Sequence, residues 1–274
     1  MSNLPQYQTL KLNINNRVAT VSLNRADKAN AMNEAMWTEL EQCFNWLDAE
    51  PEVRVVILAG EGKHFCSGLD LSVFASLQQA AENKEAARAS EALRRKILTM
   101  QSNLTAIERC RKPVLAAVHS SCIGGAVDMI SCCDMRYCSA QAVFSIKEID
   151  LAMTADVGTL QRMPNIIGDG MLRELAYTGR DMHADEALSL GLVNRVYDDR
   201  DSLLAGVESI AQAIASKSPL AIRGTKEMLL YSRDHSVADG LNYIATWNAG
   251  MLSTDDVMKA VTASMSGQPA DFED

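Results

Sequence analysis

The sequence contains no segment that would place the protein in a membrane or direct it out of the cytosol. No stretch reaches the roughly 18 uninterrupted apolar residues of a membrane span. The first residues, MSNLPQYQTL, lack a basic region followed by an apolar one, and the last, GQPADFED, lack an SKL-type peroxisomal address. These absences predict a cytoplasmic protein with no membrane partner.

Motifs for metals, disulfides and bound nucleotides are also missing. The chain has an odd number of cysteines and no CxxC pair with the spacing of a zinc site. They lie mostly in apolar runs, which predicts reduced thiols in the core: Cys43, Cys66, Cys110, Cys122, Cys132, Cys133 and Cys138. The glycines match neither a dinucleotide fingerprint nor a P-loop. We therefore expect neither a metal nor a bound redox cofactor.

Basic side chains are fewer than acidic ones. The chain has 26 basic and 35 acidic side chains, a formal net charge of -9 and an isoelectric point of about 5.0. Such a field opposes attraction to phosphate backbones, so nucleic acid is not an expected partner. An anionic ligand would have to be held by local cations and by helix N-termini.

The sequence is rich in apolar residues, which are spaced as in strands in some segments and as in helices in others. The chain has 274 residues, 47% of them hydrophobic, which is enough for a sizeable core. Residues 9–14 and 18–23 alternate around Asn15 and Asn16, which predicts a β-hairpin. Apolar residues at helical spacing after Asn33, a suitable N-cap, predict an amphipathic helix.

Later segments predict a parallel sheet covered by helices. Residues 53–60 and 113–119 are short, nearly continuous apolar runs, as expected for strands buried on both faces. The charged stretch 78–111 between them is a helical crossover, and after Gly158 the pattern is almost wholly helical. Strands and helices in front with helices behind indicate the α/β class.

Two glycine-containing turns, HFCSGLDL (residues 64–71) and SSCIGGAVDMI (residues 120–130), follow the two buried strands. Ligands commonly bind beyond the carboxyl ends of parallel strands, and glycine lets the backbone approach them closely. Two such turns side by side form a candidate two-donor oxyanion hole. Taken alone, a glycine after a strand more often marks only a tight turn.

The ordered motifs resemble one family. FCSGLDL resembles the pattern F-x-x-G-x-D of the crotonase (enoyl-CoA hydratase/isomerase) superfamily, and CIGGAVD resembles its second turn. LNRADKANAMN, GTLQRMPNIIG and ADEALSLGLVNRVY are similar to further segments, so the likeness runs from about Leu10 to Met265. It implies a crotonase-like spiral of ββα units, with a core over residues 1–200 and a helical region over 201–274. It also implies a homotrimer or a hexamer, a dimer of trimers.

Within this resemblance, the backbone N–H groups of Leu69 and Gly125 bind the oxygen of an acyl-CoA thioester. The implied set for binding CoA and the substrate is Arg25, Ala26, Lys28, Ala29, Ser67, Gly68, Asp70 and Gly124. For Asp70 the residue type alone favours a structural role, because turn aspartates usually bond local backbone. The segment SMSGQPADF lacks the lysines that relatives often place there, which leaves Arg25, Lys28 and Lys226 as candidate phosphate contacts.

Three carboxylates distinguish the reactions of the superfamily. Asp128, Glu148 and Asp156 resemble the set of dienoyl-CoA isomerases, whereas hydratases usually have a small uncharged residue at the position of Asp156. The resemblance assigns C2 deprotonation to Glu148, C6 protonation to Asp156, and orientation of the pair to Asp128. Each also has a structural alternative, as a dipole partner, a solvated strand-end charge and a helix cap respectively.

The sequence thus predicts an isomerase of fatty acid degradation that converts 3,5-dienoyl-CoA to 2,4-dienoyl-CoA. A 2-enoyl-CoA hydratase is the alternative, and a non-catalytic CoA-binding or RNA-binding relative a more distant one. His64 and His119 flank the two turns, where a buried histidine is more often a hydrogen-bonding partner than a base. Ser120 and Ser121 form no recognisable Ser-His-Asp arrangement, so we do not expect serine hydrolase chemistry.

Overall fold

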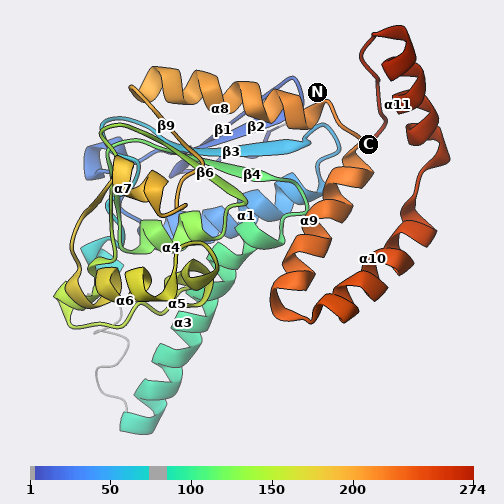
Figure 1. Ribbon diagram of the computed structural model, residues 1–274. Helices are drawn as coiled ribbons and strands as arrows, with labels where there is room; N and C mark the ends of the chain where they lie inside the picture. The colour runs from blue at the N-terminus through green and yellow to red at the C-terminus, as the bar shows by residue number, and fades with distance from the viewer. Residues whose placement is uncertain (1–3, 74–84) are drawn as a thin grey trace.

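The computed structural model describes residues 4–73 and 85–274. Within them, a six-stranded sheet of order β1-β2-β3-β4-β6-β9 crosses the molecule (Figure 1). All neighbouring pairs in it are parallel except β1 and β2. Its strands are β1 (Leu10–Asn15), β2 (Val18–Leu23), β3 (Val55–Gly60), β4 (Val114–Val118), β6 (Met135–Ser139) and β9 (Arg195–Tyr197). The predicted α/β class is confirmed.

The N-terminal hairpin forms where predicted, with its turn one residue later. Asn15 still pairs with Val18, so the turn residues are Asn16 and Arg17, at φ of 46° and 66°. Asparagine tolerates this conformation well, and arginine does so less readily. The alternating pattern therefore located the strands better than the residue types located the turn.

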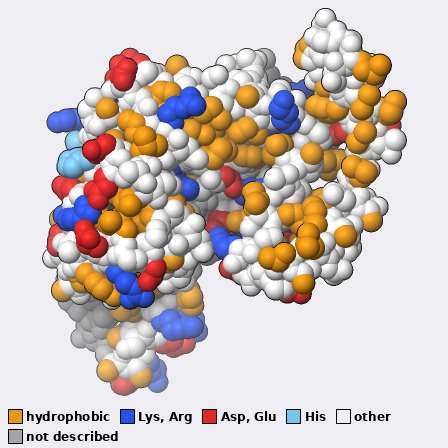
Figure 2. Space-filling view, in the orientation of Figure 1, with side chains coloured by type: hydrophobic (Ala, Val, Ile, Leu, Met, Phe, Trp, Pro, Cys, Tyr) orange, Lys and Arg blue, Asp and Glu red, His pale blue; other side chains and the backbone are white. Residues whose placement is uncertain are grey.

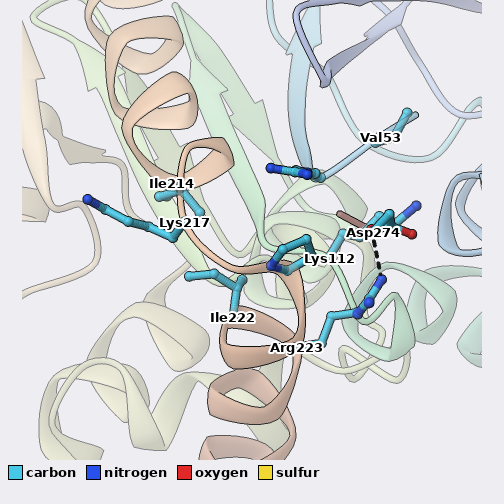
Figure 3. A pocket seen from close by; sticks show the side chains of 9 residues that line it. Val53, Lys112, Ile214, Lys217, Ile222, Arg223 and Asp274 are labelled. Carbon is cyan, nitrogen blue, oxygen red and sulfur yellow. Dashed lines mark hydrogen bonds and ion pairs between the residues drawn. The ribbon is translucent and has the colours of Figure 1, made fainter. Parts of the chain in front are cut away.

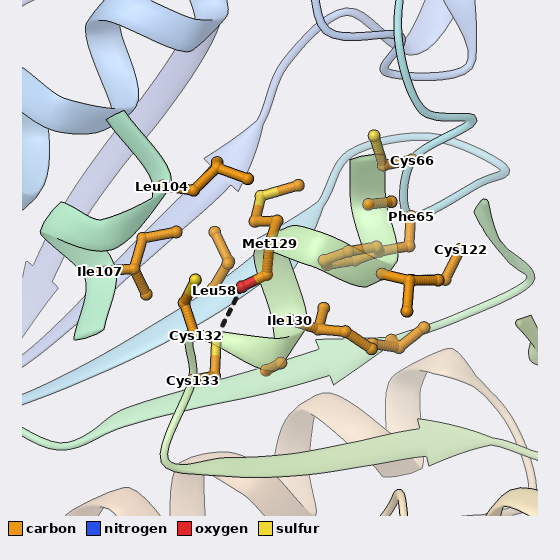
Figure 4. Packing of buried hydrophobic residues seen from close by; sticks show 14 of the residues in the cluster. Leu58, Phe65, Cys66, Leu104, Ile107, Cys122, Met129, Ile130, Cys132 and Cys133 are labelled. Carbon is orange, nitrogen blue, oxygen red and sulfur yellow. Dashed lines mark hydrogen bonds between the residues drawn. The ribbon is translucent and has the colours of Figure 1, made fainter. Parts of the chain in front are cut away.

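Helices cover both faces of the sheet, as the buried strands require. On one face lie α1 (Glu34–Ala49), α3 (Ala86–Arg109) and α4 (Gly125–Ser131). Asn33 caps α1 by accepting the N–H of Met36. Figure 4 shows how Leu58 of β3, Ile107 of α3 and Met129 of α4 contribute to one core cluster. The first part of the predicted crossover helix, residues 78–84, lies outside the described residues.

The other face of the sheet is covered by α8 (Arg200–Ala215). Its Leu203, Val207 and Ala211 pack with strand residues that include Val55 and Leu115. The expected boundary between residues 200 and 201 therefore falls inside this helix, after its first residue.

Several short strands were not predicted. A second sheet of order β5-β7-β8 comprises β5 (Ser121–Ile123), β7 (Val143–Ser145) and β8 (Met182–His183). The strands β6 and β9 were missed too. Outside these strands the chain after Gly158 is helical, as expected, with α5 (Thr159–Arg162), η3 (Met163–Asn165), α6 (Asp169–Thr178) and α7 (Ala184–Ser189). Two short helices that were not predicted, η1 (Ala26–Lys28) and η2 (Lys147–Leu151), lie before it.

The last three helices, α9 (Pro219–Asp234), α10 (Val237–Met251) and α11 (Thr254–Ser266), extend away from the sheet (Figure 1). The chain then returns to the core. Arg54 donates to the carbonyl of Phe272, and Arg223 pairs with Asp274 at 3.1 Å (Figure 3). Within the described ranges, no helix is both long and apolar enough to cross a membrane.

Candidate active site

The two predicted glycine turns lie against each other. The N–H of Cys66 donates to Ser121 O at 2.9 Å, and the N–H of Ile123 donates to Cys66 O at 3.1 Å. Gly68, at φ 91°, comes so close that a Cβ there would lie 2.6 Å from Ile123 O. Only glycine combines that backbone conformation with that approach.

The N–H of Leu69 points away from its own strand partner. Leu69 bridges Met32: the N–H of Met32 donates to Gly68 O at 2.8 Å, and the N–H of Asp70 donates to Met32 O at 3.1 Å. Successive N–H groups of an extended segment point to opposite sides, so the N–H of Leu69 faces away from Met32. Leu69 also lines the cavity described below.

Gly125 supplies the second candidate donor. It is the first residue of α4, where the N–H has no partner within the helix. The preceding turn is fixed because the N–H of Gly124 donates to Ser145 O at 2.8 Å. A Cβ on Gly68 would lie 3.6 Å from the nitrogen of Gly125, so the two turns bring both candidate donors to one place.

A cavity of about 440 Å³ opens in front of these turns. Glu148 and Asp156 line it from one side, and Leu93, Ile97 and Met100 of α3 contribute apolar walls. Its other lining residues are Trp37, Ser67, Gly68, Leu69, Ile123, Gly124, Gly125, Lys147, Leu151, Met153, Thr154 and Val157. A mostly apolar cavity with a few convergent polar groups is the expected form of a small-molecule site.

Glu148 lies directly over the second turn. A Cβ on Gly124 would be 3.1 Å from Oε1 of Glu148, and Oε2 is buried with no hydrogen-bond partner within the described residues. Burial, followed by the charges of Asp128 and Asp156, raises the pKa of Glu148 to about 7. The alternative of a solvated strand-end charge does not describe this side chain. A carboxyl with such a pKa is suited to proton transfer near neutrality.

Asp128 belongs to the same electrostatic cluster without lining the cavity. It is fully buried, and its Oδ1 accepts the N–H of Thr159 at 2.6 Å. Burial raises its pKa to about 6, the hydrogen bond from Thr159 opposes the rise, and the charge of Asp156 adds to it. Asp128 is thus a structural anchor as well as a buried acid.

Asp156 lies at the exposed edge of the cavity. Partial burial raises its pKa, opposed by a backbone hydrogen bond. It does not cap the next helix, because α5 has Gly158 at its N-cap and no side-chain cap bond. Its backbone carbonyl accepts a hydrogen bond from Gln101 Nε2 at 2.6 Å.

The segment predicted to bind CoA borders the first turn, since the N–H of Ser67 donates to Ala29 O at 3.0 Å. Ala26 and Lys28 are exposed, and Ala29 has φ of 48°. Ser67, Gly68 and Gly124 line the cavity, whereas Arg25, Ala26, Lys28, Ala29 and Asp70 are not among its lining residues.

Arg25 and Asp70 bind each other, with Nη1 of Arg25 at 2.8 Å from Oδ2 of Asp70. The pKa of Asp70 is lowered to about 2 by the backbone N–H of Ser72 and then by Arg25. Lys226 is buried and lies 2.7 Å from Asp134 Oδ2, and it is not among the cavity residues.

Asn30 shapes this region and was not singled out from the sequence. It is fully buried at φ 54°, and its amide nitrogen donates to the carbonyls of Glu61, His64 and Phe65 at 2.8, 2.9 and 3.1 Å. Its Oδ1 accepts the N–H of Arg25 at 2.8 Å. The signal in the sequence is an asparagine, a residue tolerant of positive φ, in a segment of helix formers.

The remaining candidates have structural partners. His119 Nε2 lies 3.1 Å from Gly62 O, and His64 Nδ1 lies 3.0 Å from Ser120 Oγ and 3.1 Å from Ser121 Oγ. The cysteines are all buried and free, as predicted for core thiols. In the described part of the chain, no group of three or more His, Cys, Asp or Glu side chains is placed to hold a metal ion.

The chain is similar to known enzymes that act on acyl-CoA thioesters. The peroxisomal Delta(3,5)-Delta(2,4)-dienoyl-CoA isomerase of Arabidopsis thaliana is 49% identical over 266 residues, covering 96% of each chain. The mitochondrial protein of the same activity from Homo sapiens is 47% identical over 260 residues, covering 94% of this chain and 79% of that one.

Among solved structures, an enoyl-CoA hydratase from Bacillus anthracis superposes with a TM-score of 0.87 at 29% identity, covering 97% of this chain and 99% of that one. The expected crotonase-like fold is thereby confirmed. Residues 13–274 match the enoyl-CoA hydratase/isomerase family, and the chain belongs to it.

Proposed function

We propose that this protein is an isomerase that converts 3,5-dienoyl-CoA to 2,4-dienoyl-CoA in fatty acid degradation. The observation that carries the proposal is that Glu148 and Asp156 line the same cavity beside the two glycine turns. Two relatives named as dienoyl-CoA isomerases are 49% and 47% identical to this chain, against 29% for the hydratase structure. No resident cofactor takes part, and the acyl-CoA is the substrate.

The thioester oxygen is held by the N–H groups of Leu69 and Gly125. Loss of a proton from C2 turns the thioester carbonyl into an oxyanion, and two fixed donors stabilise the negative charge that develops there. The acyl chain then runs along the apolar wall formed by Ile97 and Met100 of α3. This arrangement spreads the charge of the dienolate toward fixed donors while the chain stays out of water.

Two acids then complete the proton transfer. Glu148 takes the proton from C2, and Asp156 gives a proton to C6, at the far end of the conjugated system. At the start of the reaction Glu148 must be ionised and Asp156 must be protonated. Burial raises the pKa of Glu148 to about 7, which places its ionised state within reach near neutrality, and partial burial raises the pKa of Asp156, which favours its protonated form. Asp128, buried behind them, orients the pair.

The decisive assay offers the purified protein 3,5-dienoyl-CoA and 2-enoyl-CoA separately, with no metal or nicotinamide added. An isomerase produces the ultraviolet absorbance of a conjugated dienoyl thioester from the first substrate, without consuming water. A hydratase instead removes the absorbance of the enoyl thioester from the second. Absence of dienoyl product from a preparation that binds CoA contradicts the proposal.

The C-terminal helices support the proposal of a homotrimer or a hexamer. Figure 2 shows hydrophobic side chains gathered over the helices on the right, where α9 to α11 lie in Figure 1. Val237 is 80% exposed and Met265 84%. Other exposed apolar side chains there are Leu229, Leu241, Met251, Leu252 and Met258. Copies of this chain are the occupants we propose for this surface. Light scattering at micromolar concentration tests it, since a monomer contradicts it.

The location in the cytoplasm stays a prediction of the terminal sequences. The two named relatives are a peroxisomal and a mitochondrial protein, so their names do not support it. Fractionation of the source cells tests it directly, because an organellar protein sediments with the marker enzymes of its organelle and a cytoplasmic protein stays in the supernatant.

A further inference from the structure

Arg162, in the short helix that follows Asp156, is bound tightly to α3. Its Nε lies 3.1 Å from Oε1 of Glu108 and its Nη2 lies 3.2 Å from Oε2, a bidentate pair. Nη2 also donates to Thr105 Oγ1 at 3.1 Å. The Arg162 and Glu108 side chains are each 13% exposed, and neither lines the cavity. The pair is therefore a partly buried connection behind the site.

The same guanidinium lies on the backbone of the turn that carries Asp156. Gly158 has φ of 136°, and a Cβ there would lie 2.0 Å from Nη1 of Arg162. A larger residue at this position would displace the arginine. Arg162 thus reaches from α3 to the turn between Asp156 and Thr159.

One face of α3 holds this segment at both ends. Gln101 donates to the carbonyl of Asp156, and Thr105 and Glu108 bind Arg162. The three α3 residues are spaced by four and three, so they lie on one side of the helix. The opposite side of the segment is fixed by Thr159, which donates to Asp128 at 2.6 Å.

The residues of this connection also influence each other's pKa values. Burial is the main cause of the raised pKa of Asp128, and the positive charge of Arg162 is among the effects that oppose it. Glu108 remains ionised: burial would raise its pKa, but hydrogen bonds from Arg162 and Arg233 outweigh burial and lower it. Two arginines share the carboxylate of Glu108, and Arg233 also lies 3.5 Å from Oδ1 of Asp234.

We propose that Arg162 is a positioning residue: its pair with Glu108 holds the Asp156–Thr159 turn against Asp128. This pair thereby aligns Asp156 with Glu148 for the reaction. It touches neither substrate nor the reacting atoms. This inference rests on the proposed function, because the alignment matters only if Glu148 and Asp156 carry out the proton transfers assigned to them. A misplacement of about 1 Å in such a group costs on the order of a hundredfold in rate.

The test compares Arg162→Gln and Arg162→Lys with Arg111→Gln. Arg111 is a matched control because it also binds a carboxylate through Nε, that of Asp48, but at the opposite end of β4 from the cavity. For each variant the kcat and KM for 3,5-dienoyl-CoA, the pH profile, the thermal midpoint and the affinity for octanoyl-CoA are measured.

We expect Arg162→Gln to lower kcat by roughly 10- to 100-fold with KM and octanoyl-CoA affinity changed less than about threefold. The pH profile of kcat should move as well, since Asp128 loses an opposing charge, and Arg162→Lys should recover part of kcat. Arg111→Gln should resemble the wild type. If Arg162→Gln keeps the kcat and pH profile of the control, or loses activity only in proportion to its unfolded fraction, the inference is overturned.

Glu108→Gln and Thr105→Val keep the proposal testable if Arg162→Gln does not fold. Glu108→Gln retains the shape of its side chain and Thr105→Val removes a single bond to Arg162, so both should lower kcat several-fold without weakening octanoyl-CoA binding. Wild-type kcat in both overturns the inference. Glu148→Gln and Asp156→Asn distinguish a failure of the proposed proton-transfer roles from a failure of this inference. If both variants convert 3,5-dienoyl-CoA as fast as the wild type, the roles proposed for the two acids fail. If both are inactive while the Arg162 variants are unaffected, only this inference fails.

Discussion

The backbone N–H of Thr159 donates to Oδ1 of Asp128 at 2.6 Å, which ties the start of α5 to the interior of α4. The other oxygen, Oδ2, is buried with no partner within the described residues. A buried acid with one oxygen anchored keeps a fixed orientation, while its unpaired oxygen makes the ionised form costly. Asp128 therefore acts on the cavity through the segment it anchors and through its charge on Glu148.

The oxyanion-hole assignment predicts a large effect of replacing Gly125 with proline. Proline removes the N–H proposed to hold the thioester oxygen, at the first helical position, where its ring is otherwise well tolerated. Loss of one such donor costs about 100- to 1000-fold in kcat. Steady-state kinetics with 3,5-dienoyl-CoA measures it.

Gly125→Ala is the matched control because it keeps the N–H and adds the same Cβ. That Cβ would lie 3.1 Å from Met32 Cε, the end of a flexible side chain that has to shift slightly. We expect the alanine variant to lose far less activity than the proline variant. Equal losses in the two would show that crowding, and not the missing donor, causes the effect.

Asn30 should be essential for stability and for the geometry of the first turn. Asn30→Ala leaves the carbonyls of Glu61, His64 and Phe65 without their donor, and it places alanine at positive φ. We expect the free energy of unfolding to fall by about 3 kcal/mol or more, as measured by urea denaturation. The exposed Asn24, changed to Ala, is the control. Equal stability of the two variants would contradict the role given to Asn30.

Glu148 should make the protein less stable as the pH rises. Its pKa is raised from 4.5 to about 7 on folding, so the native state binds more protons between these values. The free energy of unfolding therefore falls as pH rises through this window, by up to roughly 3 kcal/mol from this group. Glu148→Gln cannot ionise and should show a flatter dependence and greater stability at pH 8.

The control for this experiment is Glu91→Gln, on an exposed face of α3, which should retain the slope of the wild type. Asp128 adds to the slope in both proteins, because burial also raises its pKa. A Glu148→Gln variant with the full wild-type slope would show that the carboxyl does not ionise differently in the folded and unfolded states.

Long periodic segments of this fold were predictable, and short polar ones were not. The apolar runs that became β3 and β4 are buried throughout, so their residue types alone report their surroundings. In β6, Arg136 is buried because its guanidinium donates to the carbonyls of Leu192 and Cys133. Leu192 lies 56 positions from Arg136 in the chain, so the local sequence does not show that this arginine is buried in a strand.

The same distinction applies to the candidate site. Gly68 and Gly124 have positive φ and lie in the predicted turns, where residue type and spacing were informative. The tie between Asp128 and Thr159 and the pair of Arg162 with Glu108 join residues more than 30 positions apart. Periodicity carries no information about such contacts, and they became visible only from the packing of α3, α4 and α5.

The division of labour between the two cavity acids leads to a prediction about isotope exchange. If Glu148 takes the C2 proton and Asp156 delivers one at C6, Asp156→Asn should block formation of 2,4-dienoyl-CoA. It should still allow C2 protons of the substrate to exchange with deuterated solvent, as long as Glu148 exchanges its own proton in the complex. Glu148→Gln should abolish both, because an amide keeps the shape of the acid but cannot carry the proton.

Mass spectrometry of substrate recovered from deuterated buffer measures the exchange, and absorbance measures the product. Asp156 is exposed at the edge of the cavity and its carbonyl is held by Gln101, so the amide should leave the backbone in place. An Asp156→Asn enzyme as fast as the wild type would show that Asp156 is not the acid that protonates C6. Equal loss of exchange in both variants would mean that the acids titrate as one coupled unit, and the separate roles would have to be withdrawn.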